Sequence, residues 1–369
     1  MPFLLDDDHR QIVQEAERIM ADGWSPDRLR DLLEQTGAHD DAFWATCREM
    51  GWTGITIDEA HDGLALGPIA LCLTAQMVGR FAGGAPFLST GYGVSEGLRL
   101  AAPAPLADEW LPKLADGSAI GAIWLNAALS QDRPALTLRD GALHGTAGPV
   151  AAGLQANLLV ALAHNEASGE DLLVLAALGE RTTRTPVQTF DNSRGYADLR
   201  FDGAAVTVLS GGREGALDLL ARVAVVTAFE QLGAAEASLE RARAFANERE
   251  AFGQPIGKFQ AVKHRIAEMY VGNELARGNA MRAALSLRDD ADDLVLRAGA
   301  ARLSASEASE FAAREAIQTH GAIGVTWEHD LHLFYRRARS LSLELGSVAE
   351  WQDVVADRVI AAQAGKAAA

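Results

Sequence analysis

Cysteine is scarce in this 369-residue sequence, which contains only Cys47 and Cys72. A disulfide framework needs more cysteines, and a zinc site needs Cys and His at short, regular intervals. We therefore expect two buried, inert thiols and no metal centre.

Long hydrophobic runs and an amino-terminal targeting pattern are also lacking. No tract is long and apolar enough to cross a bilayer. Residues 1–10 are acidic, whereas a secretory signal has a basic stretch followed by an apolar one. We expect a cytoplasmic protein that does not enter the membrane.

Positive charge is in deficit, because 33 Lys and Arg residues face 50 Asp and Glu residues, for a formal net charge of −17. Nucleic acids and anionic membranes are normally bound by clustered Lys and Arg. Neither is an expected partner, and an anionic ligand would have to be held by a few placed cations.

The apolar pattern divides the chain into three parts, which we expect to be a helical domain over residues 1–118, a β domain over 119–211 and a helical domain over 212–369. In the first part, apolar residues recur at helical spacing, as in Ile12, Val13, Ala16, Ile19 and Met20. Ser25-Pro26 has the form of a cap and a first-turn proline, and Gly37 ends that segment. A further helix carries Phe43, Trp44 and Met50.

The middle part has the short apolar runs of strands, at residues 135–138, 158–163 and 172–178. Asp140-Gly141 indicates a tight hairpin, because this pair tolerates the positive backbone angles of the turn. Val206 and Val208 are in a position to close the sheet.

After Gly211-Gly212 the chain is rich in strong helix formers. Four long helices are expected, with approximate limits 214–247, 258–287, 292–320 and 329–362. Each has one apolar face, and an antiparallel four-helix bundle buries such faces best.

Several motifs occur in a fixed order along the chain. Residues 249–257 read Arg-Glu-Ala-Phe-Gly-Gln-Pro-Ile-Gly and are followed by Phe259-Gln260, while residues 318–324 read Gln-Thr-His-Gly-Ala-Ile-Gly. Supporting pieces are Met50-Gly51-Trp52, residues 190–194 (Phe-Asp-Asn-Ser-Arg) and residues 230–233 (Glu-Gln-Leu-Gly). In this order the chain resembles the acyl-CoA dehydrogenases, which implies their fold: an N-terminal helical domain, a middle β-sandwich or barrel and a C-terminal four-helix bundle.

The resemblance implies which residues bind the FAD of a neighbouring subunit. Arg249 matches the arginine that binds the pyrophosphate, and Phe252 matches the phenylalanine that packs nearby; a guanidinium suits this role because it can bond two phosphate oxygens at once. Gly253 and Gln260 belong to the same motif. The family's Gln-x-x-Gly-Gly-x-Gly bend, whose amides approach the neighbour's dinucleotide, corresponds to Gln318, Gly321 and Gly324, with Ala322 in place of the second glycine.

The catalytic base of the family has no counterpart. The family reaction removes the alpha proton of an acyl-CoA thioester and needs a carboxylate beside the flavin, which usually precedes a Gly-Thr pair. Here Leu345 precedes Gly346-Ser347, and leucine cannot accept a proton. Glu344 is adjacent, but one step along the chain turns its side chain away. Arg222 occupies the region of an alternative base on the first bundle helix, and it either meets a CoA group or forms a surface salt bridge. We predict no catalytic residue in this chain.

The flavin-ring side also departs from the family pattern. Residues 125–132 read Leu-Asn-Ala-Ala-Leu-Ser-Gln-Asp instead of the Thr-Glu-Pro-x-x-Gly-Ser-Asp loop, and Pro149-Val150-Ala151 stands where Trp-Ile-Thr is common. By this resemblance, the groups lent to a neighbour's flavin are kept and those offered to the chain's own flavin are weakened.

This asymmetry resembles the heteromeric acyl-CoA dehydrogenases that act on steroid side-chain CoA thioesters, alpha2beta2 assemblies with one FAD per pair of subunits. The resemblance implies an oxidoreductase subunit without the base, a homologous alpha subunit as partner and an acyl-CoA substrate. Two other interpretations are open: a self-sufficient flavoenzyme (a dehydrogenase with a displaced base such as Glu344, or a flavin monooxygenase), or a flavin-free scaffold. His264 and His320 have no evident Ser or Cys partner for a nucleophilic relay, and we interpret them as packing or surface residues.

Overall fold

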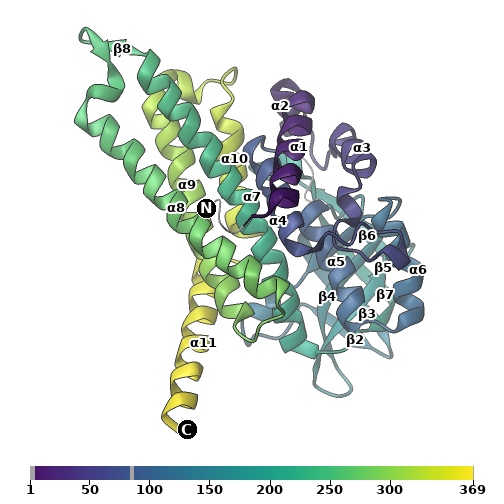
Figure 1. The fold of residues 1–369 in the computed structure, drawn as a ribbon. Coiled ribbons are helices and arrows are strands. Elements are labelled where there is room, and N and C mark those ends of the chain that lie inside the picture. Colours follow the sequence, from purple (N-terminus) through teal and green to yellow (C-terminus); the bar gives the residue numbers. More distant parts are fainter. Residues whose placement is uncertain (1–4, 84–86, 369) are drawn as a thin grey trace. The chain divides into compact units, whose positions relative to one another are not determined.

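The computed structural model describes residues 5–83 and 87–368 (Figure 1). These residues form two compact units. The first, called the mixed unit here, contains residues 28–71 and 87–224. The second, called the helical unit, contains residues 5–27, 72–83 and 225–368. Helices α4 and α7 each contribute one part to both units.

The secondary structure follows the predicted order of helices, strands and helices. The helices are α1 (Asp7–Gly23), α2 (Pro26–Leu33), α3 (Asp41–Glu49), α4 (Gly67–Arg80), α5 (Phe87–Ala101), α6 (Ala104–Ala115), α7 (Gly212–Glu248), α8 (Gln260–Arg288), α9 (Leu294–His320), α10 (Leu331–Glu344) and α11 (Val348–Ala368). The strands are β1 (Gly121–Trp124), β2 (Leu136–Arg139), β3 (Ala142–Ala151), β4 (Leu158–Asn165), β5 (Asp171–Ala177), β6 (Thr182–Val187), β7 (Tyr196–Val208), β8 (Glu250–Ala251) and β9 (Gln254–Pro255). Short 3-10 segments are η1 (Trp52–Gly54), η2 (Glu59–His61), η3 (Asn126–Leu129), η4 (Asn192–Arg194), η5 (Ile256–Lys258) and η6 (Gly321–Val325).

The amino-terminal helices begin where side chains can cap them. The Asp6 side chain accepts a hydrogen bond from the His9 backbone amide at the start of α1, and Asp40 accepts one from Phe43 at the start of α3. Such caps satisfy amides that have no partner inside the helix. The predicted start of α2 at Pro26 and the turn at Gly37, which has a φ of +74°, are confirmed.

The seven strands β1–β7 of the mixed unit form one sheet that curls toward a barrel. β5 pairs with both β7 and β4, so the path from β4 through β2, β3, β7 and β5 returns to β4. The predicted hairpin at Asp140-Gly141 is confirmed: both residues have positive φ, and β2 and β3 pair on either side. The predicted closure by Val206 and Val208 is also confirmed, since they pair with Ala176 and Val174 of β5.

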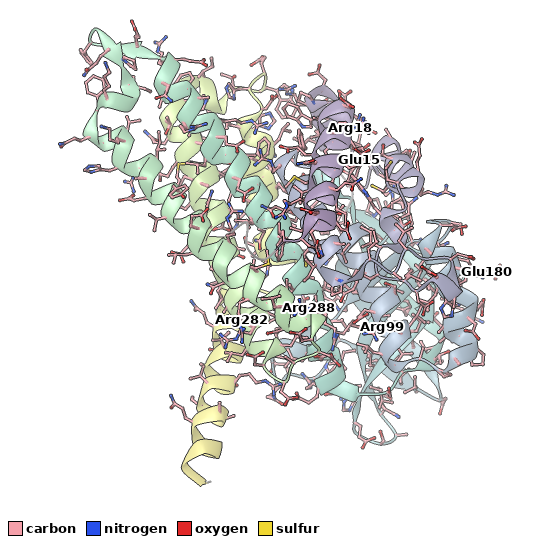
Figure 2. The ribbon with its side chains drawn as sticks, viewed as in Figure 1. Glu15, Arg18, Arg99, Glu180, Arg282 and Arg288 are labelled. Carbon is pink, nitrogen blue, oxygen red and sulfur yellow. The ribbon has the colours of Figure 1, made fainter. Side chains whose placement is uncertain are left out.

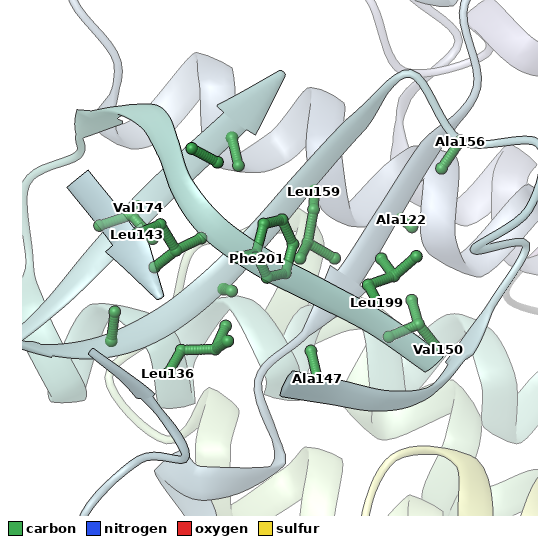
Figure 3. Close-up of a cluster of buried hydrophobic side chains, with 14 of the residues drawn as sticks. Ala122, Leu136, Leu143, Ala147, Val150, Ala156, Leu159, Val174, Leu199 and Phe201 are labelled. Atoms are coloured by element: carbon green, nitrogen blue, oxygen red, sulfur yellow. The ribbon is translucent and has the colours of Figure 1, made fainter. Parts of the chain in front are cut away.

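Apolar side chains from all sides of this curled sheet fill its interior (Figure 3). Phe201 lies among leucines and valines from neighbouring strands. The buried set includes Leu136, Leu143, Ala147, Val150, Leu159, Val174, Leu199 and Phe201. Alternate residues of a strand point to opposite faces, so the inward-facing positions build one continuous core.

The helical unit is dominated by α7, α8, α9, α10 and α11. The predicted limits of the first three differ from the observed ones by at most two residues. The fourth predicted helix, over 329–362, is wrong as a single element, because the chain breaks at Leu345–Ser347. Gly346 has a φ of +89°, and Ser347 and Glu350 form a reciprocal cap that starts α11: the Ser347 amide donates to Glu350 over 2.7 Å and the Glu350 amide donates to Ser347 Oγ.

Ion pairs between exposed side chains lie on the outer faces of helices in the helical unit. Arg18 bonds Glu15 within α1, and Arg288 bonds Asp289 at the end of α8 (Figure 2). Within residues 5–83 and 87–368, every helix is too short or too polar to cross a lipid bilayer.

Candidate functional site

The predicted Arg249 motif forms a two-residue hairpin between α7 and α8. The Arg249 amide still donates to Phe245 of α7 over 2.8 Å, and the Ile256 amide donates to the Arg249 carbonyl over 2.8 Å. Between these bonds the chain turns at Phe252 and Gly253, which have φ values of +53° and +77°. Two positive φ values at the centre of a hairpin are the geometry of a type I′ turn.

Phe252 stands at the tip of this hairpin, and its side chain is 97% exposed. Its ring makes an edge contact with the ring of Phe259, with the ring centroids 6.1 Å apart. A bulky residue at positive φ is unfavourable, and a large apolar side chain in water is unfavourable as well. Both features at one residue mark the tip as a candidate contact surface.

The polar residues of the motif lie beside the tip and are open to solvent. Arg249 and Gln260 are exposed, Gln260 being the first residue of α8. A β-carbon built at Gly253 would meet no atom within 4 Å. The hairpin therefore presents a guanidinium, a carboxamide and unobstructed backbone, which are groups that can bind an anion.

The second predicted motif forms the bend at the end of α9. Gln318 is exposed in the last turn of the helix, and Gly321 ends the helix with a φ of +65° and open space where a β-carbon would lie. Gly324 is buried, and a β-carbon there would lie 2.9 Å from the Ile317 carbonyl oxygen. Ala322, which replaces a family glycine, is exposed.

His320 connects the two motifs. Its ring stacks on Phe245 of α7 with centroids 4.1 Å apart, and its Nδ1 lies 2.7 Å from the Ala316 carbonyl oxygen. Burial lowers the pKa of His320, and the nearby His329 and Arg241 act in the same direction. The hairpin after α7 and the bend after α9 thus lie at one end of the bundle (Figure 1). Sequence reasoning found both motifs and missed this contact.

The position expected for a base holds an apolar, enclosed side chain. Leu345 is 3% exposed and follows the last residue of α10. Its carbonyl accepts a 2.8 Å hydrogen bond from the Trp351 indole. Glu344, the adjacent acid, is half-buried.

In the mixed unit, the side chain of Arg213, at the start of α7, binds the backbone of the 125–132 segment. Its guanidinium donates to the backbone oxygens of Ala127 and Ser130, and to that of Asp132 over 2.7 Å. It also bonds the Asp171 carboxylate over 2.6 Å. Three carbonyl groups of this segment are therefore turned toward an arginine of the same unit.

Arg222 forms salt bridges, which was one of its two expected roles, but its own side chain is buried and not at the surface. Its side chain is 6% exposed and donates to Glu96 over 3.0 Å and to Asp218 over 2.7 Å. It is therefore a buried partner of two carboxylates.

Both thiols are buried, as predicted. Cys47 and Cys72 are 0% exposed, and burial raises the pKa of each well above that of a reactive thiol. In the described part of the chain, no group of three His, Cys, Asp and Glu side chains is arranged to hold a metal ion.

Comparison with known proteins gives a consistent result over the whole chain. Residues 6–118 match the acyl-CoA dehydrogenase N-terminal domain model, and residues 211–360 match the acyl-CoA dehydrogenase C-terminal domain model. The acyl-CoA dehydrogenase IpdE2 of Mycobacterium tuberculosis (strain ATCC 25618 / H37Rv) is 31% identical over 351 residues, which cover 93% of this chain and 95% of that protein.

Solved structures show the same fold. A variant of the Tcur3481-Tcur3483 steroid ACAD superposes with a TM-score of 0.88 at 24% identity, covering 97% of this chain and 99% of the other. The ChsE4-ChsE5 complex from Mycobacterium tuberculosis gives a TM-score of 0.88 at 22% identity, covering 98% and 99%. The predicted fold class, a helical domain, a β domain and a helical bundle, is confirmed.

Proposed function

Because the chain belongs to the acyl-CoA dehydrogenase family, whose enzymes oxidise a CH–CH bond, we propose that it is the base-lacking subunit of a heteromeric, FAD-dependent acyl-CoA dehydrogenase. In this proposal it lends the hairpin at Arg249 and the bend at Gly321 to an FAD that is held chiefly by a homologous partner subunit. The observation that carries the proposal is the contrast between Phe252, exposed at a strained tip, and Leu345, enclosed where a base would be needed.

The residues at the bundle end fit part of a dinucleotide site. The pyrophosphate of FAD is anionic and needs a cation and hydrogen-bond donors, since the chain as a whole is strongly acidic. Arg249 is an exposed guanidinium, and at Gly253 and Gly321 no side chain blocks the backbone. The fit is partial because three backbone carbonyls of the 125–132 segment are bonded to Arg213.

Each residue has a distinct task in this proposal. Arg249 would hold phosphate oxygens, and Phe252 would pack its ring against the partner. The backbone amides near Gly321 and Gly324, with Gln318, would bond other polar atoms of the dinucleotide. When bound, FAD supplies hydride acceptance, while the proton is taken by a carboxylate of the partner, because Leu345 cannot accept it.

The relatives suggest the kind of partner and substrate. The ChsE4-ChsE5 structure is a complex of two proteins, and the Tcur3481-Tcur3483 protein is described as a steroid ACAD. We therefore propose an alpha2beta2 assembly with a homologous subunit that carries the base, acting on an acyl-CoA with a bulky, steroid-like acyl group.

The test is to produce the chain alone, and together with a homologous acyl-CoA dehydrogenase that has the glutamate base. We expect flavin absorbance and acyl-CoA dehydrogenation, with an artificial electron acceptor, only from the pair. A lone chain that binds FAD and turns over substrate contradicts the proposal. Oxygen consumption by that lone protein would indicate a monooxygenase instead.

Substitutions at Arg249 test the donated site directly. Arg249→Ala removes charge-assisted hydrogen bonds worth about 1.5–3 kcal/mol, so FAD should bind roughly tenfold to a hundredfold more weakly to the pair. Arg249→Lys should restore only part of the affinity, because an ammonium cannot bond two oxygens in a fork. Arg288→Ala is the matched control, since Arg288 is exposed on α8 and pairs with Asp289. Unchanged flavin content in Arg249→Ala would favour a flavin-free scaffold.

A further inference from the structure

His320 is the point at which three elements of the helical unit meet. It is the last residue of α9, it stacks on Phe245 of α7, and its ring meets the His329 ring edge-on with centroids 4.9 Å apart, just before α10 begins. Its Nδ1 is 2.7 Å from the Ala316 carbonyl oxygen. Because a carbonyl only accepts, Nδ1 carries the proton, and the ring is anchored to its own helix.

The Arg249 hairpin and the Gly321 bend, the two motifs proposed to reach the partner's FAD, both begin at this contact. Gly321, the start of the bend, directly follows His320, and the Arg249 amide donates to the carbonyl of Phe245. The hairpin and the bend share no strand pairing. The buried cluster that contains Ala242 and Ala316 packs α7 against α9 below this point, and the His320–Phe245 stack is the contact nearest to both motifs through which the position of one can constrain the other.

Resting on the function proposed above, we propose that His320 is a positioning residue that couples the Arg249 hairpin to the Gly321 bend, so that both reach the partner's FAD in one fixed arrangement. The side chain does not touch the dinucleotide in this proposal. It acts by holding α7, α9 and the start of α10 together.

The coupling should depend on the charge of the imidazole. His320 is buried and is faced by Arg241 on α7 and by His329 before α10, and Asp330 acts on Arg241. Burial is the main reason why the pKa of His320 is lowered, and the charges of His329 and Arg241 act in the same direction. We call the arrangement with His320 stacked on Phe245 closed and the one with this stack broken open. His320 takes up a proton more readily in the open arrangement than in the closed one. The closed arrangement is thus favoured above the ordinary histidine pKa of about 6.5 and loses stability as the pH falls below it.

The experiment compares His320→Ala, His320→Phe and the exposed control His264→Ala in the assembled pair. The alanine removes the stack, whereas the phenylalanine keeps it but cannot take up a proton. We expect His320→Ala to raise the Kd for FAD by about tenfold, and His320→Phe to stay within about twofold of the wild type at neutral pH. Between about pH 8 and pH 5.5, the Kd of the wild type should rise more steeply than that of His320→Phe.

A second measurement does not require flavin. Hydrogen exchange of the chain alone should become faster in His320→Ala at both 249–253 and 321–325, and should recover in His320→Phe. Faster exchange at the bend only, with an unchanged hairpin, overturns the coupling. A wild-type pair without flavin would refute the proposed function, and the exchange result would still decide the role of His320.

Discussion

The Glu96 carboxylate accepts a 3.0 Å hydrogen bond from the guanidinium of Arg222 inside the mixed unit, where both side chains are less than a tenth exposed. Removing one partner of a buried ion pair leaves the other charged and poorly solvated. Glu96→Gln should therefore lower the free energy of unfolding by about 3 kcal/mol, measured by urea denaturation.

The double variant Glu96→Gln/Arg222→Met should recover part of this loss, because it removes both buried charges. Glu15→Gln is the control, since Glu15 pairs with Arg18 on the exposed face of α1, where an ion pair contributes little. Equal effects of the buried and the exposed substitution would contradict this account.

Close packing of α4 on α7 in the helical unit depends on Gly79. A β-carbon at this position would lie 1.9 Å from the Glu230 carbonyl oxygen, a backbone atom that cannot turn away. Gly79→Ala should destabilise the protein by about 3 kcal/mol. Gly272→Ala is the opposite case, because α8 leaves open space there, and it should stabilise by up to about 1 kcal/mol. Thermal unfolding of both variants measures these changes. Opposite signs would show that packing governs position 79 and helix propensity governs position 272.

The sequence contained most of the local structure of this chain. Helical periodicity, the proline at Pro26 and the Asp140-Gly141 turn are determined by neighbouring residues, and they appear as predicted. The break at Leu345–Ser347 was missed, although its signal was present. Ser347 and Glu350 have the spacing of a capping box, but the apolar pattern continues across the break and favours one long helix.

The candidate site was only partly predictable, for a physical reason. The Arg249 and Gln318 motifs are local and can be recognised along the chain. The stack of His320 on Phe245 joins α9 to α7, and the ion pair of Arg222 joins α7 to α5. Contacts of this kind follow from how helices pack, which periodicity alone does not determine.

The tip residue Phe252 should show a conflict between stability and function. Asn-Gly suits a type I′ turn, whereas Phe at a φ of +53° is strained. Phe252→Asn should thus raise the melting temperature of the lone chain, because the free energy of unfolding increases by up to about 1 kcal/mol. In the pair, the same variant should weaken FAD binding because the ring is lost. Asp140→Asn, in a turn of the same type, should change neither property.

Acid sensitivity is expected at the cluster of Asp171, His164 and Arg213. Burial alone would raise the pKa of Asp171, but hydrogen bonds from His164 and Arg213 outweigh it, and the net pKa lies below the ordinary value. A carboxyl with a lowered pKa stabilises the fold above its unfolded pKa of about 3.9 and loses this contribution as the pH falls further. Asp171→Asn should therefore be less stable at neutral pH and should show a shallower loss of stability in acid, which urea titrations across that range measure.

Restoring a carboxylate at position 345 should not create a second active site. Leu345 is 3% exposed beside the Trp351 indole, so Leu345→Glu places an acid in an enclosed position and should cost roughly 3 kcal/mol or more of stability. Leu343→Glu is the control, because Leu343 is half exposed in the last turn of α10, just before Leu345, and its substitution should change stability by less than about 0.5 kcal/mol. If the base were the only missing part, the lone Leu345→Glu chain would bind FAD and oxidise acyl-CoA. We expect neither, because the backbone oxygens of Ala127, Ser130 and Asp132 are bonded to Arg213, and in our proposal this segment does not cradle a flavin of its own. The measurement is flavin stoichiometry and turnover of the lone variant, and of its pair with the partner, which should keep one FAD per two chains.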